Sequence, residues 1–254
     1  MSHTPIPARL ICIHIEKTAG NSFRTLAYQN YGRENVFWSG IDSRQPIVRE
    51  QDLTDYTVVG GHWSMHHYKS HNATNLYCSL LREPIKRMKS LFHFTRTRMD
   101  PAGQKKWQEF GFDPDSLSMT LRQSPKFISM IKNRQCQMLT GQQSYVDAKR
   151  VMENGNFIVG TLDDHAEYIT ELARQLGWQH TALPHKNKSD TPYQDDIQID
   201  EDLAPLVEEL CAQDQLLYNA IKQRTVYTQV NQELAKRLAP EPLEEALTPQ
   251  SISA

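Results

Sequence analysis

Short apolar runs alternate with longer polar and amphipathic stretches along this chain. Four of the runs are predicted to be buried strands, because they are short, apolar and rich in β-branched residues: 10–15, 56–60, 76–81 and 157–160. A shorter strand is predicted at residues 36–39.

Helical patterns separate these strands. Helices are predicted at residues 21–31, 84–99, 163–176 and 203–224, and a polar helical stretch at 100–155. Asn21 or Ser22 is expected to cap the first helix, and Asp163 or Asp164 the third. Strands that alternate with helices indicate an α/β fold with a mainly parallel sheet. We expect one domain over residues 1–235 and a flexible tail over 236–254.

The composition narrows the functional classes. With 254 residues and a net charge of −2, the chain is not suited to non-specific nucleic-acid binding as its main task, although a local basic pocket is allowed. No run approaches the ~20 apolar residues of a membrane span. No signal peptide is visible, so a cytoplasmic location is expected. The four cysteines are scattered, which favours buried, reduced thiols. Nothing in the sequence indicates the oligomeric state.

Ligands of parallel α/β sheets bind outside the carboxyl ends of the strands, and three such exits carry polar residues. The first reads "HIEKTAGNSF" (14–23), where unpaired N–H groups at a helix N-terminus, together with Lys17 and Gly20, suit an anion. An ordinary βα turn with a solvent-facing lysine is the alternative. The third, "LLREPIKRMKS" (80–90), ends a strand at Arg82, a residue suited to phosphate binding. Pairing of Arg82 with Glu83 or another surface carboxylate is the alternative there.

Taken together, "HIEKTAGNS" (14–22) and "REPIKRMKS" (82–90) are more specific. They resemble the paired signature of sulfotransferases that use 3′-phosphoadenosine 5′-phosphosulfate (PAPS). The resemblance is to the carbohydrate-type branch, which includes the heparan sulfate 2-O-sulfotransferases and bacterial relatives. Weaker similarities follow at residues 133–141, 157–164 and 214–221, so the resemblance spans about residues 9–224.

The resemblance implies a sulfotransferase-type fold, with a P-loop-like parallel sheet flanked by helices. It implies PAPS as co-substrate, no metal, and a small-molecule or carbohydrate acceptor with a hydroxyl or amine. Arg82 and Ser90 would bind the 3′-phosphate, and Lys17 would also be catalytic. The 5′-phosphosulfate would lie on Lys17, Thr18, Ala19, Gly20, Asn21 and Ser22, with the Thr18 and Ser22 hydroxyls as donors.

Two residues of these motifs have less certain roles. Glu16 stands where the family most often has proline, and a carboxylate facing a phosphate site would be repulsive. We expect Glu16 to point away or to pair with a base such as Arg24. Arg87 lies on the helix within the second motif, and the resemblance leaves its role open.

The second exit reads "GGHWSMHHYKSH" (60–71). In the 2-O-sulfotransferases a histidine after glycine in the corresponding segment is thought to be the catalytic base, which implies that role for His62. A neutral imidazole suits it. A metal site is a rival, because His62 and His66, and His67 and His71, are each spaced by four. A loop histidine hydrogen-bonded in place is the third interpretation.

Two other functions stay open at this stage. A P-loop nucleotide kinase would share the strand–loop–helix, but it needs Gly-Lys-[Ser/Thr] and a magnesium-binding aspartate, whereas Lys17 precedes Gly20 here. A non-enzymatic nucleotide- or metal-binding module is the other. The acceptor cannot be read from the sequence, although residues 96–108 supply basic and aromatic groups that would suit a sugar.

Overall fold

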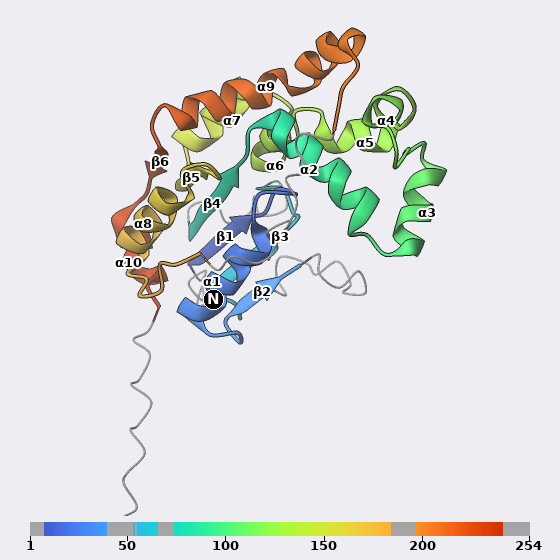
Figure 1. The fold of residues 1–254 in the computed structure, drawn as a ribbon. Helices are drawn as coiled ribbons and strands as arrows, with labels where there is room; N and C mark the ends of the chain where they lie inside the picture. The colour runs from blue at the N-terminus through green and yellow to red at the C-terminus, as the bar shows by residue number, and fades with distance from the viewer. Residues whose placement is uncertain (1–7, 40–52, 54, 66–73, 184–196, 241–254) are drawn as a thin grey trace, which may run out of the picture.

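The computed structural model describes residues 8–39, 53, 55–65, 74–183 and 197–240 (Figure 1). Within this part of the chain, six strands form one sheet in the order β2-β3-β1-β4-β5-β6. The strands are β1 (Arg9–Ile13), β2 (Val36–Trp38), β3 (Val58–Gly61), β4 (Asn75–Leu81), β5 (Phe157–Thr161) and β6 (Val226–Gln229). All neighbours pair parallel except β5 and β6. The predicted α/β class with a mainly parallel sheet is confirmed.

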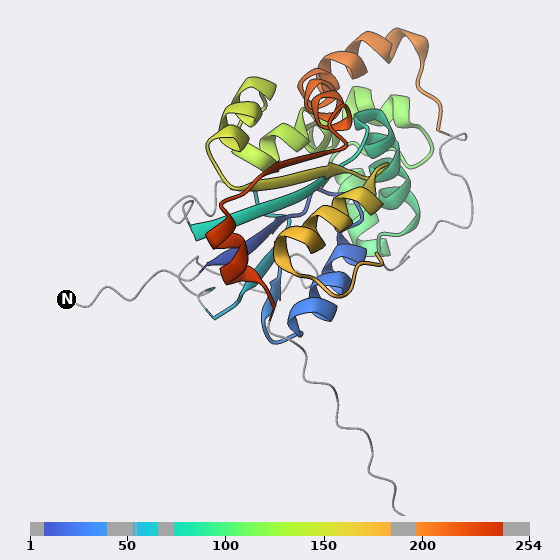
Figure 2. The ribbon, with the colours of Figure 1, turned by 90° about the vertical axis from the view of Figure 1, so that its left-hand side faces the viewer.

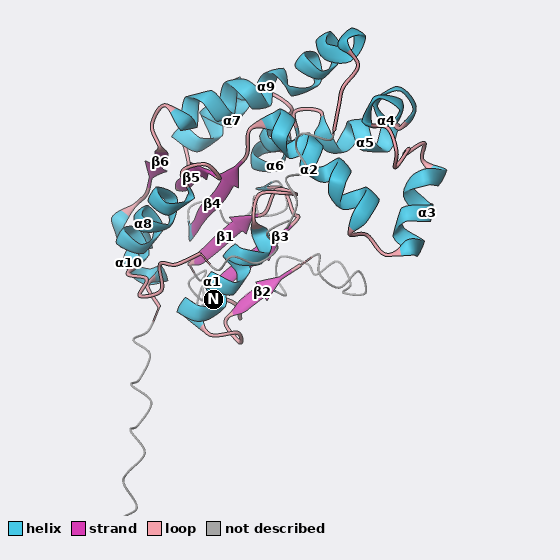
Figure 3. Ribbon diagram, viewed as in Figure 1, coloured by secondary structure: helices cyan, strands magenta, loops and turns pink. Residues whose placement is uncertain are grey.

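Helices cover both faces of the sheet (Figures 2 and 3). One face carries α1 (Gly20–Tyr31), α8 (His165–Leu176) and α10 (Gln232–Leu238). The other carries α6 (Arg134–Thr140), α7 (Tyr145–Glu153) and α9 (Ala204–Lys222). Successive residues of β1 point to opposite faces, so Leu10 packs in the first core and Ile11 in the second.

A third apolar cluster lies beyond the sheet. It joins α2 (Pro84–Thr97), α3 (Pro101–Glu109), α4 (Leu117–Gln123) and α5 (Pro125–Ile131) to the first half of α9, which follows a 3₁₀ turn (Glu201–Leu203). Phe92, Trp107 and Phe127 are buried at its centre. The expectation of a helical 100–155 segment is confirmed. Its helices α3, α4 and α5 pack with α2, whereas α6 and α7 cover the sheet.

The predicted caps need correction. Helix α1 begins at Gly20 after Ala19, whose φ is 64°, and no side chain caps it. Asn21 and Ser22 therefore lie inside the first turn. Asp164 does precede α8, but its side chain makes no cap hydrogen bond. The Asp164 carboxylate instead accepts from Thr161 and Lys222.

The C-terminal part was only partly foreseen. Strand β6 was missed because it is a four-residue edge strand, with two of its residues exposed. The expected tail from residue 236 begins too early, because α10 runs to Leu238 and buries Leu234, Ala235 and Leu238. Residues 241–254 lie outside the described residues. Within the described part, no helix has the length and apolarity needed to cross a bilayer.

Candidate functional site

The three strand exits meet at one edge of the sheet. Strands β3, β1 and β4 are neighbours and run parallel, so their carboxyl ends lie together. The Arg82 Nη1 atom donates to the Lys17 carbonyl oxygen at 3.2 Å, and the His62 Nδ1 atom lies 3.0 Å from the His14 carbonyl oxygen. The predicted grouping of Lys17, Arg82 and His62 is therefore present.

Residues 17–22, which we call the lysine turn, have an unusual backbone. Lys17 and Ala19 adopt φ values of 70° and 64°, which non-glycine residues rarely do. Among the described residues, no acceptor bonds the N–H groups of Ala19, Gly20 or Asn21. Successive free N–H groups at a helix N-terminus form a concavity suited to an anion. The turn has the geometry expected of a phosphate-binding loop.

Gly20 is required by packing against His14. A Cβ atom at Gly20 would lie 2.0 Å from the His14 ring. That ring is held 4.4 Å, centroid to centroid, from the ring of His62. Burial and the nearby His62 lower the pKa of His14 to about 3, so this imidazole is neutral at physiological pH. His14 thus supports the lysine turn without adding charge.

Lys17 is half-buried and lies in a cationic environment. Burial, together with the positive charges of Arg82 and Arg98, lowers its pKa to about 8. Its Nζ atom lies 4.2 Å from the centroid of the Phe94 ring. Within the described chain, the charges that act on this ammonium are both positive. The alternative of a solvent-facing lysine is wrong.

Arg82 is held by its backbone. The Arg82 N–H donates to Gln135 Oε1 at 2.9 Å, and Gln135 Nε2 donates to the Arg82 carbonyl oxygen at 2.9 Å. Gln135 is fully buried. Glu83 does not use its carboxylate on Arg82; it caps α2 by accepting from the backbone N–H groups of Ile85 and Lys86. The predicted pairing of Arg82 with Glu83 in particular is therefore wrong.

Residues 133–135 lie in one of the segments with weaker similarity to the sulfotransferases, and they position Gln135 for its two hydrogen bonds with Arg82. Asn133 has a φ of 42°, and its Oδ1 atom accepts from the backbone N–H groups of Gln213 and Asp214 on α9. The buried Asp214 carboxylate accepts from the N–H groups of Gln135 and Cys136. The sequence indicates a similarity at residues 133–141 but predicts no role for Asn133, Arg134 or Gln135. This segment joins α6 and α9 to the exit of β4.

Other motif residues serve the fold. Arg87 is buried and donates to the Met130 and Ile131 carbonyl oxygens, so it is not available to a phosphate. The Thr18 hydroxyl donates to the Ile15 carbonyl oxygen at 2.9 Å, which corrects its expected use as a phosphate donor. Ser22 and Ser90 are buried, and no described residue bonds their hydroxyls.

Glu16 pairs with a base, as expected, but this base is Arg134. Arg134 on α6 holds the Glu16 carboxylate with two hydrogen bonds, from Nη2 at 2.8 Å and from Nε at 3.3 Å. Burial alone would raise the pKa of Glu16, but the Arg134 hydrogen bond and charge outweigh it and lower the pKa to about 2. Arg24 is not the partner. The ion pair explains how a carboxylate is tolerated beside the lysine turn.

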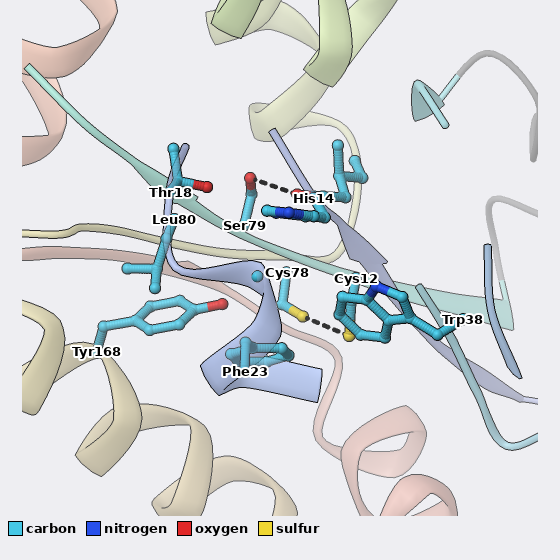
Figure 4. Close-up of a pocket in the computed structure, with 11 residues that line it drawn as sticks. Cys12, His14, Thr18, Phe23, Trp38, Cys78, Ser79, Leu80 and Tyr168 are labelled. Atoms are coloured by element: carbon cyan, nitrogen blue, oxygen red, sulfur yellow. Dashed lines mark hydrogen bonds between the residues drawn. The ribbon is translucent and has the colours of Figure 1, made fainter. Parts of the chain in front are cut away.

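A small cavity lies behind the lysine turn, between β1, β4 and α8 (Figure 4). Its volume of about 20 Å³ is enough for roughly one water molecule. Thr18, His14 and Tyr168 line it, together with Cys12 and Cys78, whose Sγ atoms are 3.3 Å apart. All four cysteines are buried, as expected, and none of them is joined in a disulfide in the structure.

Of the four histidines in the predicted metal site, the structure describes His62. In the described ranges, no group of three or more His, Cys, Asp or Glu side chains is placed to hold a metal ion. His66, His67 and His71 lie outside the described residues.

Neither the protein-family models nor the curated proteins contain a match to this chain.

Proposed function

We propose that this protein is a sulfotransferase with a P-loop-like fold that uses PAPS as co-substrate. One observation carries the proposal: the Arg82 guanidinium touches the lysine turn, 3.2 Å from the Lys17 carbonyl oxygen. This hydrogen bond joins the two signatures, although Lys17 and Arg82 are 65 residues apart in sequence. A nucleotide with phosphate groups at both its 5′ and 3′ positions needs two neighbouring anion sites, and the lysine turn and Arg82 offer them.

The residues present fit such a ligand. The free N–H groups of Ala19, Gly20 and Asn21 would hold the 5′-phosphate, with the Ser22 hydroxyl. Arg82 would hold the 3′-phosphate, with the Ser90 hydroxyl nearby on α2. Lys17 would stabilise the charge left on the departing phosphate. The accumulated positive charge of Lys17, Arg82 and Arg98 is relieved when an anion binds.

PAPS supplies an activated sulfuryl group on its 5′-phosphate. In the transfer, the bond between sulfur and the bridging phosphate oxygen breaks, and a bond forms between sulfur and the acceptor oxygen or nitrogen. The acceptor proton passes to His62, and 3′-phosphoadenosine 5′-phosphate leaves. We propose a small molecule or a carbohydrate as the acceptor.

His62 has a geometry that suits a general base. A backbone carbonyl only accepts, so the contact with the His14 oxygen makes Nδ1 the protonated nitrogen of the neutral ring. Nε2 is then the lone-pair atom that takes the acceptor proton. The side chain is 37 % exposed, which lets it meet an acceptor. A positioned base contributes roughly 10²–10⁴ to the rate.

The kinase alternative has less support. Asp163 and Asp164 follow β5 at the same edge of the sheet, where a magnesium-binding aspartate would be sought. Asp163 accepts from the Tyr218 hydroxyl at 2.6 Å, and Lys222 bonds both oxygens of Asp164. These carboxylates already have partners in the fold.

The proposal is tested by thermal unfolding with 3′-phosphoadenosine 5′-phosphate, AMP and ATP. At 100 times its dissociation constant a ligand adds ~2.7 kcal/mol to the stability of the native state. We expect the bisphosphate to stabilise the protein well beyond AMP, and Arg82→Ala to abolish that difference. The surface variant Arg33→Ala should keep it. Equal shifts with AMP, or a preference for ATP, would reject the proposal, and labelled PAPS with an acceptor panel then tests transfer.

A further inference from the structure

We propose that Glu16 is a positioning residue for His62, a carboxylate that stabilises the imidazolium formed when His62 accepts the acceptor proton. This inference rests on the proposed function. Glu16 stands where the similar family most often has proline, so the role belongs to this chain's own residues.

The geometry places the two side chains together. The Glu16 Oε1 atom lies 4.0 Å from His62 Nδ1, and the same oxygen accepts from Arg134 Nη2 at 2.8 Å. Only 12 % of the Glu16 side chain is exposed, so its charge is poorly screened by water. The distance is too long for a hydrogen bond, and Nδ1 already faces the His14 carbonyl oxygen. Glu16 therefore acts through charge.

The charges around His62 make this interaction attractive. In the described part of the chain, His62 faces Glu16 and the ring of His14. Arg134 contacts the Glu16 carboxylate. Arg134 keeps the pKa of Glu16 near 2, so the carboxylate is ionised wherever the enzyme would work. His14 is neutral and does not repel a protonated His62.

The consequence concerns the transition state. Before transfer the His62 ring is neutral and gains little from Glu16. As Nε2 takes the acceptor proton, the ring becomes a cation 4.0 Å from a fixed carboxylate. An interaction that strengthens only as the reaction proceeds raises kcat and leaves substrate affinity unchanged.

Glu16→Gln removes the carboxylate beside His62 and keeps the size of the side chain. We expect it to lower kcat by about tenfold or more with little change in KM. Glu34→Gln removes an exposed carboxylate outside the site and should keep kcat within about threefold. Glu16→Asp should recover most of the loss.

A second measurement separates this effect from a loss of the binding site. Stabilisation by 3′-phosphoadenosine 5′-phosphate, measured by thermal unfolding, should be the same in Glu16→Gln as in the wild type. An unchanged kcat in Glu16→Gln, or a loss that Glu16→Asp does not recover, would overturn the inference. A wild-type protein that ignores the 3′-phosphate and transfers nothing from PAPS would reject the proposed function itself, and the inference with it.

Discussion

The Glu16–Arg134 ion pair should make the stability of this protein depend on acidity in a defined range. The pKa of Glu16 falls from 4.5 to about 2 in the folded protein, because the hydrogen bond and charge of Arg134 outweigh the cost of burial. A lowered folded-state pKa means that the unfolded chain binds the proton more readily. The stabilisation is therefore present above pH 4.5 and is lost as the pH falls toward 2.

The size of the effect follows from the two pKa values. A fall from 4.5 to about 2 corresponds to about 3 kcal/mol of stability at neutral pH. About 2 kcal/mol of this is gone by roughly pH 3. Glu16→Gln cannot be ionised, so its stability lacks this contribution. The difference in free energy of unfolding between wild type and Glu16→Gln should shrink by about 2 kcal/mol between neutral pH and roughly pH 3.

Urea denaturation followed by circular dichroism, at matched ionic strength, measures this difference. Glu34→Gln is a matched control, because Glu34 is exposed and belongs to no ion pair in the described chain. Its stability should follow that of the wild type at every pH. A difference between wild type and Glu16→Gln that stays constant from neutral pH to pH 3 would refute the reasoning.

Three other predictions address the site. Gln135→Leu removes the two hydrogen bonds that Gln135 makes with the part-buried N–H and C=O groups of Arg82, so urea denaturation should show a loss of about 2 kcal/mol, and calorimetry weaker binding of 3′-phosphoadenosine 5′-phosphate; wild-type stability in that variant would contradict this role of Gln135. Gly20→Ala places a methyl group on the His14 ring and should weaken the same binding, whereas adding His14→Ala should restore it; failure of the double variant to recover would mean that the ring is not the obstacle. The affinity for this ligand should fall as the pH rises through about 8, where Lys17 loses its charge, and should stay level in Lys17→Arg; a level profile in the wild type would show that the Lys17 charge does not contribute.

The residues of the candidate site lie in short segments that directly follow strands in the sequence. Each exit is a short sequence that ends a strand, and the parallel order of β3, β1 and β4 brings the three exits together. This is why residues as far apart as Lys17, His62 and Arg82 could be grouped before any contact was known. The helix ends were harder: Ala19 stands at the start of α1 in a left-handed conformation that its side chain does not favour.

The sequence by itself determined five of the six described strands, their mainly parallel arrangement and the grouping of three polar strand exits, because apolar period and motif spacing are local properties. Only the tertiary structure decided which side chains meet. Glu16 finds Arg134 at a separation of 118 residues, and Gln135 finds Arg82 at 53. Arg87 is buried by the packing of α2 against α5, although its place in the motif resembled a ligand position. Partners of this kind are chosen by packing between distant elements, and no local pattern encodes them.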